Sequence, residues 1–264
     1  MPDQRQHRGP NPRDAEAFAP EMLPRLRAAC ADLCWLLSRG YAEKSAGTLV
    51  GDRYALTERQ RIAVRRCACS DEQLIDRQGR QVTDPVALTG AILEIDGYNV
   101  LTTVEAALAS AVMLIGRDGS YRDMASMHGN FKKVAETPKA ITLIGQTLAR
   151  YSLQSALWYL DAPVSNSARL KQLLLEIAAA QHWLWQVELV PDPDRILAVS
   201  PAIIASADSA ILDRCPRWLS LAREVVEEHL PLATTVEFHI LSPTKRGFGK
   251  PTATSRNPRQ PKFG

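Results

Sequence analysis

Four short apolar runs constrain the fold of this chain more than any other feature of its sequence. None of them alternates strictly between apolar and polar residues, a pattern that is typical of parallel strands buried on both faces. Helical patterns at 136–152 and 167–181 lie between them and predict an α/β fold with a doubly wound parallel sheet. A helix at 217–229 and a strand at 235–241 are expected to complete this sheet. The four runs are AILEI (91–95), SALWYL (155–160), WQVELV (185–190) and AIIAS (202–206).

The residues before the first run predict a unit made only of helices. Apolar residues recur at helical spacing over 21–38. Farther along, Thr57 with Gln60 and Ser70 with Gln73 have the spacing of capping boxes, in which each side chain bonds the other residue's backbone N–H group. Each pair therefore predicts the start of a helix.

We expect the chain to have three parts. A helical N-terminal domain spans 1–80, an α/β domain spans 86–241, and a basic tail spans 242–264. The polar, turn-rich segment DRQGRQVTDP at 76–85 is the expected boundary between the first two parts. The tail is rich in Thr, Ser, Pro, Gly, Lys and Arg, a composition that is typical of disordered segments.

The net charge of +3 hides an uneven distribution along the chain. Residues 1–85 carry a net charge of +2, residues 86–241 carry −5, and residues 242–264 carry +6. The basic tail is either a solubilising extension or an electrostatic arm for a polyanion.

Nothing in the sequence indicates export or a membrane. The N-terminal residues lack the apolar core of a signal peptide, and no apolar run approaches the roughly 18 residues of a membrane span. We therefore expect a soluble, cytoplasmic protein with no membrane partner. Its five cysteines are expected to be buried, reduced thiols. The alternative is a zinc site formed by Cys30, Cys34, Cys67 and Cys69, whose spacing is not that of standard zinc knuckles.

Acidic residues follow each of the four apolar runs. They are Asp96, Asp161, the pair Asp192 and Asp194, and Asp208. Because the carboxyl ends of parallel strands share one edge of a sheet, these acids are expected to gather there and to repel one another. Mg²⁺ or Mn²⁺, held by a few of the carboxylates, would relieve the repulsion. The alternative is scattered helix caps and turns, and Asp208 before SAIL has the position of an N-cap.

Three segments resemble the core motifs of a known enzyme class. LEIDGYNVL, LWYLDA and IIASADSAIL, in this order, are similar to the motifs of NYN-type nucleases in the PIN-like superfamily, which are metal-dependent RNases on a Rossmann-like sheet. The resemblance covers about 86–230. It implies that Asp96 is the central metal ligand, that Asn99 orients a ligand or a water, and that Asp161 and Asp208 are further catalytic and metal-binding acids.

The remaining metal ligand departs from the nuclease pattern. Those nucleases usually carry an acid on a helix before the fourth strand, and the segment here is only PDPDRILAVSP. Asp194 is the candidate, with Asp192 second. The whole chain, including VGDRYALTERQR in the helical front, also resembles an uncharacterised bacterial and archaeal family, the domain-of-unknown-function 434/5616 proteins.

Basic and polar residues near the predicted site suggest contacts with a nucleic acid. The loop 115–133 combines cations with aromatic residues that would hold a strand by charge and stacking, although a solvated loop is an equal alternative. Ser165 and Asn166 precede a helix whose N-terminus would attract phosphate, and simple capping is the alternative there. The cations of the loop are Arg117, Arg122, Lys132 and Lys133.

These observations give two hypotheses of function. The first is a metal-dependent nuclease that hydrolyses phosphodiesters, with RNA as the favoured substrate. The second is a non-catalytic nucleic-acid-binding protein whose PIN-like site has lost a ligand. A small-molecule phosphate enzyme is disfavoured because it has little use for a basic loop and tail. The sequence does not predict an oligomeric state.

Overall fold

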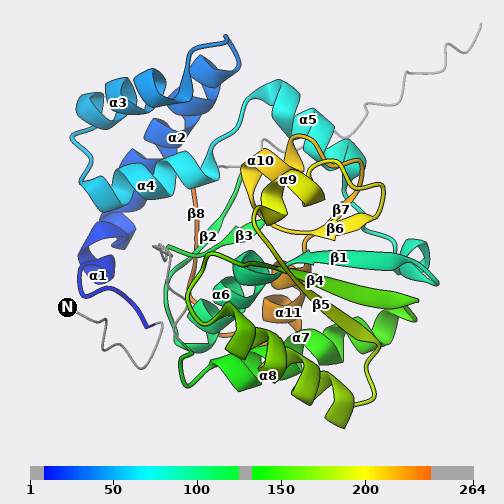
Figure 1. Cartoon of the computed structure of the whole chain (residues 1–264). Coiled ribbons are helices and arrows are strands. Elements are labelled where there is room, and N and C mark those ends of the chain that lie inside the picture. Colours follow the sequence, from blue (N-terminus) through cyan, green and yellow to red (C-terminus); the bar gives the residue numbers. More distant parts are fainter. Residues whose placement is uncertain (1–8, 125–132, 239–264) are drawn as a thin grey trace, which may run out of the picture.

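A five-stranded parallel sheet forms the centre of the protein (Figure 1). The computed structural model describes residues 9–124 and 133–238. The strand order is β5-β4-β1-β6-β7, and every neighbouring pair is parallel. The predicted α/β class and parallel sheet are therefore confirmed. The strands are β1 (Ile92–Asp96), β4 (Ser155–Asp161), β5 (Trp185–Val190), β6 (Ile203–Ala205) and β7 (Trp218–Leu219).

Helices cover both faces of this sheet, but unequally. Four longer helices pack their apolar residues against Leu93, Ile95 and Trp158 on one face. Two short helices cover part of the other face, where Leu197 and Ile211 pack against Tyr159, Ile204 and Trp218. Figure 1 shows these two groups on opposite sides of the sheet. The first group is α6 (Gly97–Leu108), α7 (Thr137–Leu148), α8 (Ser167–Ala180) and α11 (Leu221–His229), and the second is α9 (Pro193–Leu197) and α10 (Ser209–Leu212).

The predicted last strand does not complete the main sheet. Residues Thr235–Glu237 form β8, which pairs in parallel with β2 (Met113–Ile115) in a separate sheet of order β3-β2-β8. Phe238 follows β8 outside the strand, and residues 239–241 of the predicted strand lie outside the described residues. The fifth strand of the main sheet is instead β7, which occupies the start of the predicted helix at 217–229. β3 (Tyr121–Arg122) completes the smaller sheet.

The predicted helical front is confirmed. Both capping boxes are formed: the Thr57 and Ser70 side chains accept the backbone N–H groups of Gln60 and Gln73, whose side chains bond back. The helices are α1 (Asp14–Ala17), α2 (Leu23–Leu37), α3 (Glu43–Arg53), α4 (Glu58–Cys67) and α5 (Asp71–Arg80). Short 3-10 turns are η1 (Pro20–Met22), η2 (Pro85–Leu88) and η3 (Ala149–Tyr151). No helix of the described segments has the length and apolar character needed to cross a membrane.

The front helices share a hydrophobic core with the smaller sheet. Leu114 of β2, Val236 of β8 and Phe238 are buried together with Leu26 and Leu33 of α2. β8 therefore pairs with β2, where its apolar side chain packs against the front helices, and it does not join the main sheet. Helix α5 continues into the expected boundary segment at 76–85. The limits of the three predicted parts stay a prediction.

A buried ion network ties the front to the main sheet. Arg77 on α5 donates to Asp118 at 2.6 Å and to Asp213, after α10, at 2.7 Å. Asp118 also accepts from Arg122 at 2.7 Å, and Arg122 donates to the backbone oxygen of Ala207 at 2.8 Å. Burial disfavours the charged form of Asp118, but the charges and hydrogen bonds of both arginines, with the hydrogen bond from Ser120, hold its pKa well below the usual range.

Replacing Arg77 tests this network. Arg77→Met keeps the apolar stem but leaves Asp213 without its ion pair and Asp118 with one arginine, so we expect a loss of about 3–5 kcal/mol in the free energy of unfolding. The matched control is Arg53→Met, which removes an exposed ion pair to Asp32 and is expected to cost less than about 1 kcal/mol. Urea denaturation measures both. Equal stability of the two variants would show that the network does not hold the parts together.

Candidate functional site

The candidate site lies at the carboxyl ends of the central strands, where ligands bind in open α/β sheets. Asp96 is the last residue of β1, paired in register with Tyr159 of β4, and α6 begins at the next residue, Gly97. A Cβ atom on Gly97 would lie 2.6 Å from Leu160 Cδ2 and 2.8 Å from the backbone oxygen of Tyr159. The glycine beside Asp96 is therefore required by the close approach of α6 to β4.

The Asp96 carboxyl group is buried and binds its proton more tightly than an ordinary aspartic acid does. Its Oδ2 atom accepts a hydrogen bond from Ser206 Oγ at 2.8 Å, and its Oδ1 atom accepts the backbone N–H of Asn99 at 3.4 Å. The pKa of Asp96 is raised to about 7, chiefly because burial disfavours the charged form. The hydrogen bond from Ser206 opposes this shift, while the charges of Asp194 and Asp208 add to it.

Asn99 and Ser206 fasten the end of β1 to the segment that follows β6. The Asn99 Oδ1 atom accepts the backbone N–H of Ala207 at 2.9 Å. Ser206 Oγ donates to Asp96 and accepts the backbone N–H of Asp208 at 3.0 Å. Asn99, predicted to orient a ligand or a water, thus has its amide oxygen bonded to the backbone. Sequence reasoning missed Ser206, whose signal was a serine directly after an apolar strand and two residues before an acid.

Two of the other acids serve as helix caps. Asp208 is the N-cap of α10, and its Oδ1 atom accepts the backbone N–H groups of Ala210 at 2.7 Å and Ile211 at 3.4 Å. Asp192 caps α9 through the N–H of Arg195 at 3.1 Å. The capping alternative is therefore correct for Asp208, although capping by one oxygen leaves its charge at the sheet edge.

Electrostatic repulsion links the acids into one group. The pKa of Asp194, in the first turn of α9, is raised by burial and then by the charges of Asp208, Asp161 and Asp192. Asp161, the last residue of β4, also has a raised pKa because of burial and the charge of Asp192. Within the described residues, no Lys, Arg or His forms an ion pair with any of these acids.

The oxygen donors suit a hard divalent cation, but they do not form a finished metal site. Carboxylate oxygens are the ligands that Mg²⁺ and Mn²⁺ prefer. Among the side chains that the structure describes, no three of His, Cys, Asp or Glu are placed to hold one metal ion. A cation shared by Asp96, Asp194 and Asp208 would therefore need at least the Asp194 side chain to turn toward the other two.

The predicted cations of the loop lie apart from this edge or inside the protein. Arg117 faces the front helices, where it donates to Asp71 at 2.5 Å and to the backbone oxygen of Cys69 at 2.8 Å. Arg122 is buried and bonded to Asp118 and to the backbone of Ala207. We therefore assign Arg122 a structural role in place of the predicted contact with a phosphate. Lys132 lies outside the described residues.

The other predicted nucleic-acid contacts lie near the start of α8. Lys133 and Asn166 line a cavity of about 430 Å³ together with Arg169. Ser165 is exposed just before this helix. α8 begins six residues after Asp161, the last residue of β4.

The raised pKa of Asp96 predicts a pH-dependent stability. In the folded protein the Asp96 carboxyl group stays protonated up to about pH 7, whereas the same group in the unfolded chain loses its proton near pH ~4. Between these values the folded state binds more protons, so the free energy of unfolding falls as pH rises, by up to roughly 4 kcal/mol. Asp96→Asn removes this pH-dependent contribution of Asp96 to the free energy of unfolding. In chelator, we expect the variant to match or exceed wild-type stability at about pH 8, with any advantage shrinking toward about pH 4.

Urea denaturation at several pH values measures this difference. Asp84→Asn, an exposed cap of η2, is the control and should follow the wild type throughout. A variant that is much less stable than the wild type at about pH 8 would show that the charged carboxylate itself holds the fold.

Comparison with known proteins identifies the family but not an activity. A family model described as "Domain of unknown function (DUF5616)" matches residues 85–224, and another, "Protein of unknown function (DUF434)", matches residues 25–80. The chain is 30% identical over 189 residues to "Uncharacterized protein MJ0935" of Methanocaldococcus jannaschii, covering 71% of this chain and 88% of that protein. No solved structure matches the chain. Because the first model spans more than half of the chain, the protein belongs to the family described as Domain of unknown function (DUF5616).

Proposed function

We propose that the protein is a metal-dependent phosphodiesterase, with RNA as its favoured substrate. The observation that carries the proposal is the buried Asp96 carboxyl group, whose pKa is raised to about 7 beside two further acids. A buried acid of this kind, without a cationic partner among the described residues, is common at functional sites. Asp96, Asp161, Asp194 and Asp208 would hold Mg²⁺ or Mn²⁺.

The side chains around Asp96 have defined tasks in this proposal. When bound, the cation lowers the pKa of a bound water and neutralises charge on a phosphate. Ser206 and the backbone of Asn99 hold the two oxygens of Asp96 in one orientation. Asp208 keeps one oxygen on the N–H groups of α10, and its other oxygen is the one available for a ligand. Asp194 adds charge from α9.

The preference for RNA rests on the nuclease-like motifs and on positive charge. Lys133 and Arg169 line the cavity at α8, and this helix begins six residues after Asp161 along the chain. The tail at 242–264, which lies outside the described residues, carries six Lys and Arg and no acids. Cations at several points suit a chain of phosphates better than a small phosphate ester.

One observation favours the second candidate, a non-catalytic nucleic-acid-binding protein. Asp208 and Asp192 cap helices, and no three acids of the described segments are placed around a common point. If these side chains stay where they are, the site has no complete metal ligation. The protein would then bind RNA through its cations without cleaving it.

Asp208→Asn separates the two candidates. Asn caps helices as well as Asp does, so stability without metal should be almost unchanged. In the wild type, Mn²⁺ at about 100 times its Kd should raise the free energy of unfolding by about 2.7 kcal/mol, because it binds only the folded state. We expect this gain and any Mn²⁺-dependent cleavage of single-stranded RNA to be strongly reduced in the variant.

The matched control is again Asp84→Asn, which removes a capping carboxylate far from the site and should keep both responses. A wild type that binds RNA but neither gains stability from Mn²⁺ or Mg²⁺ nor cleaves RNA would contradict the proposal. The binding protein would then be the correct reading.

A further inference from the structure

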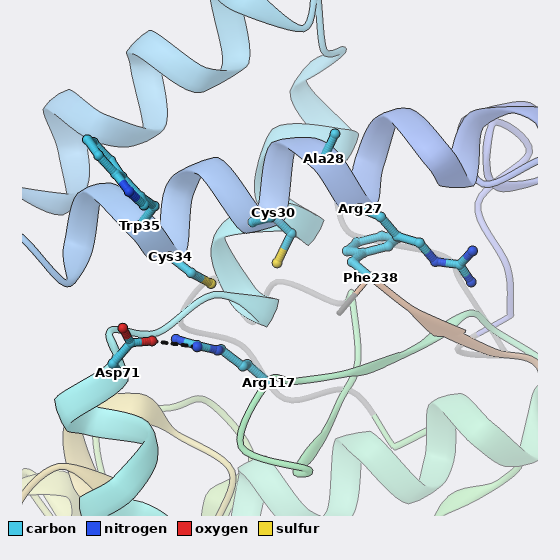
Figure 2. Close-up of a pocket in the computed structure, with 9 residues that line it drawn as sticks. Arg27, Ala28, Cys30, Cys34, Trp35, Asp71, Arg117 and Phe238 are labelled. Atoms are coloured by element: carbon cyan, nitrogen blue, oxygen red, sulfur yellow. Dashed lines mark hydrogen bonds and ion pairs between the residues drawn. The ribbon is translucent and has the colours of Figure 1, made fainter. Parts of the chain in front are cut away.

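A second cluster of reactive side chains lies between the front helices, far along the chain from Asp96. Cys30 and Cys34 are one turn apart on α2, Cys67 ends α4, and Cys69 follows it. All four are buried, and none forms a disulfide. The first two line a cavity of about 500 Å³ together with Arg117 and other residues. Figure 2 shows both sulfur atoms pointing from α2 toward the segment that carries the ion pair of Arg117.

The surroundings of Cys34 favour its thiolate. Its pKa is lowered to about 7, first because the Cys30 thiol donates a hydrogen bond to it. Burial opposes this shift, whereas the backbone N–H of Cys69 and the charge of Arg117 assist it, and the charge of Asp71 opposes it. These groups come from α2, the end of α4, the β2–β3 turn and α5.

The other cysteines of the cluster remain protonated. The pKa of Cys30 is raised well above its ordinary value because its proton is shared with Cys34 and because it is buried. Burial raises the pKa of Cys67 and of Cys69 to about 12. The cluster therefore presents one thiolate near neutral pH, with a neutral thiol beside it.

A zinc site is the weaker explanation of this cluster. Structural zinc needs four converging ligands, usually deprotonated thiols or imidazoles. Within the part of the chain that the structure describes, no three Cys, His, Asp or Glu side chains are placed to hold a metal ion. The alternative predicted from the spacing of the cysteines thus lacks the required geometry, and a single nucleophilic sulfur atom facing a cavity fits better.

We propose that Cys34 is a thiol-modification site that forms a mixed disulfide with low-molecular-weight disulfides entering the cavity between α2 and the Arg117–Asp71 ion pair. The Cys34 thiolate attacks one sulfur atom of the disulfide, a new S–S bond forms, and the old S–S bond breaks. The other half leaves as a thiolate and takes a proton from water. The small disulfide is the oxidant, and Cys34 is oxidised.

Cys30 does not resolve this adduct while α2 is intact. Residues one turn apart on a helix have Cβ atoms about 5–6 Å apart. A disulfide needs Cβ atoms about 3.5–4.5 Å apart. The neighbouring thiol therefore acts as a hydrogen-bond donor, a positioning residue for Cys34.

The pH dependence of the reaction is a sharper signature than its rate. At pH 7 a thiol of pKa about 7 is roughly half ionised, against about 3% for an ordinary thiol of pKa about 8.5. Its lower basicity offsets much of this gain, so the net advantage is only about threefold. Limited access through the cavity reduces the rate further. The midpoint of the rate against pH is unaffected by access.

The test is to incubate the reduced full-length chain with oxidised glutathione and to map the adduct by peptide mass spectrometry. We expect one glutathione per chain, on Cys34, with a rate midpoint near pH 7. Cys34→Ser should lose the adduct, and Cys215→Ser, a buried cysteine beneath α10, should keep it. Cys30→Ala should move the midpoint upward, and Cys30→Ser, which keeps a donor, should restore it.

Three results of the glutathione experiment would overturn the proposal, and the wild type alone is sufficient to give each of them. They are an adduct that forms only after unfolding, a first adduct on another cysteine, and an adduct on Cys34 with an ordinary midpoint near pH ~8.5. Protection of several cysteines by one bound Zn²⁺ would also overturn it, because the sulfur atoms would then be metal ligands.

Discussion

The buried carboxylate of Asp118, held between Arg77 and Arg122, links the helical front, the β2–β3 turn and the end of β6. Arg77 comes from the helical front, Asp118 from the β2–β3 turn, and Arg122 reaches the backbone of Ala207 at the end of β6. Ala207 in turn bonds the side chain of Asn99 at the start of α6. One continuous set of hydrogen bonds therefore runs from α5 to the residues around Asp96.

This arrangement makes the position of Asp96 a consequence of the fold rather than of a flexible loop. Its main chain belongs to the central strand, and Gly97 permits α6 to pack directly against β4. The fold thus holds an acid in a place where its charged form is disfavoured, beside other acids that repel it. Asp96, Asp192 and Asp208 each cap a helix through one oxygen. The cation that we propose would offset the repulsion among the charges that remain.

The parts of the fold that depend on local patterns could be predicted from the sequence. Apolar runs marked the strands β1, β4, β5 and β6, and the capping boxes marked the starts of α4 and α5. The expected burial was wrong for β5, an edge strand in which only Val187 is buried. The strand Trp218–Leu219 is too short to show a period, so it was absorbed into a helical pattern. The pairing of β8 with β2 depends on contacts between residues more than a hundred positions apart, which no local pattern reports.

The candidate site divides in the same way. The acids at the strand ends follow from the rule that parallel strands share one carboxyl edge, and Asp96, Asp161, Asp194 and Asp208 do lie at that edge. The hydrogen-bond partners at the site could not be predicted from the same rule. Ser206 bonds Asp96 and the backbone of Ala207 bonds Asn99, and both come from the segment after β6. Arg122 was predicted to contact phosphate because of its charge, but it is buried and bonded to Asp118.

Anomalous scattering from a crystal of the protein soaked in Mn²⁺ tests the proposed metal centre directly. We predict an anomalous peak between Asp96 and Asp208, with the Asp194 side chain turned toward it. A well-ordered site without this peak at millimolar Mn²⁺ would contradict the metal centre and the hydrolytic function that rests on it.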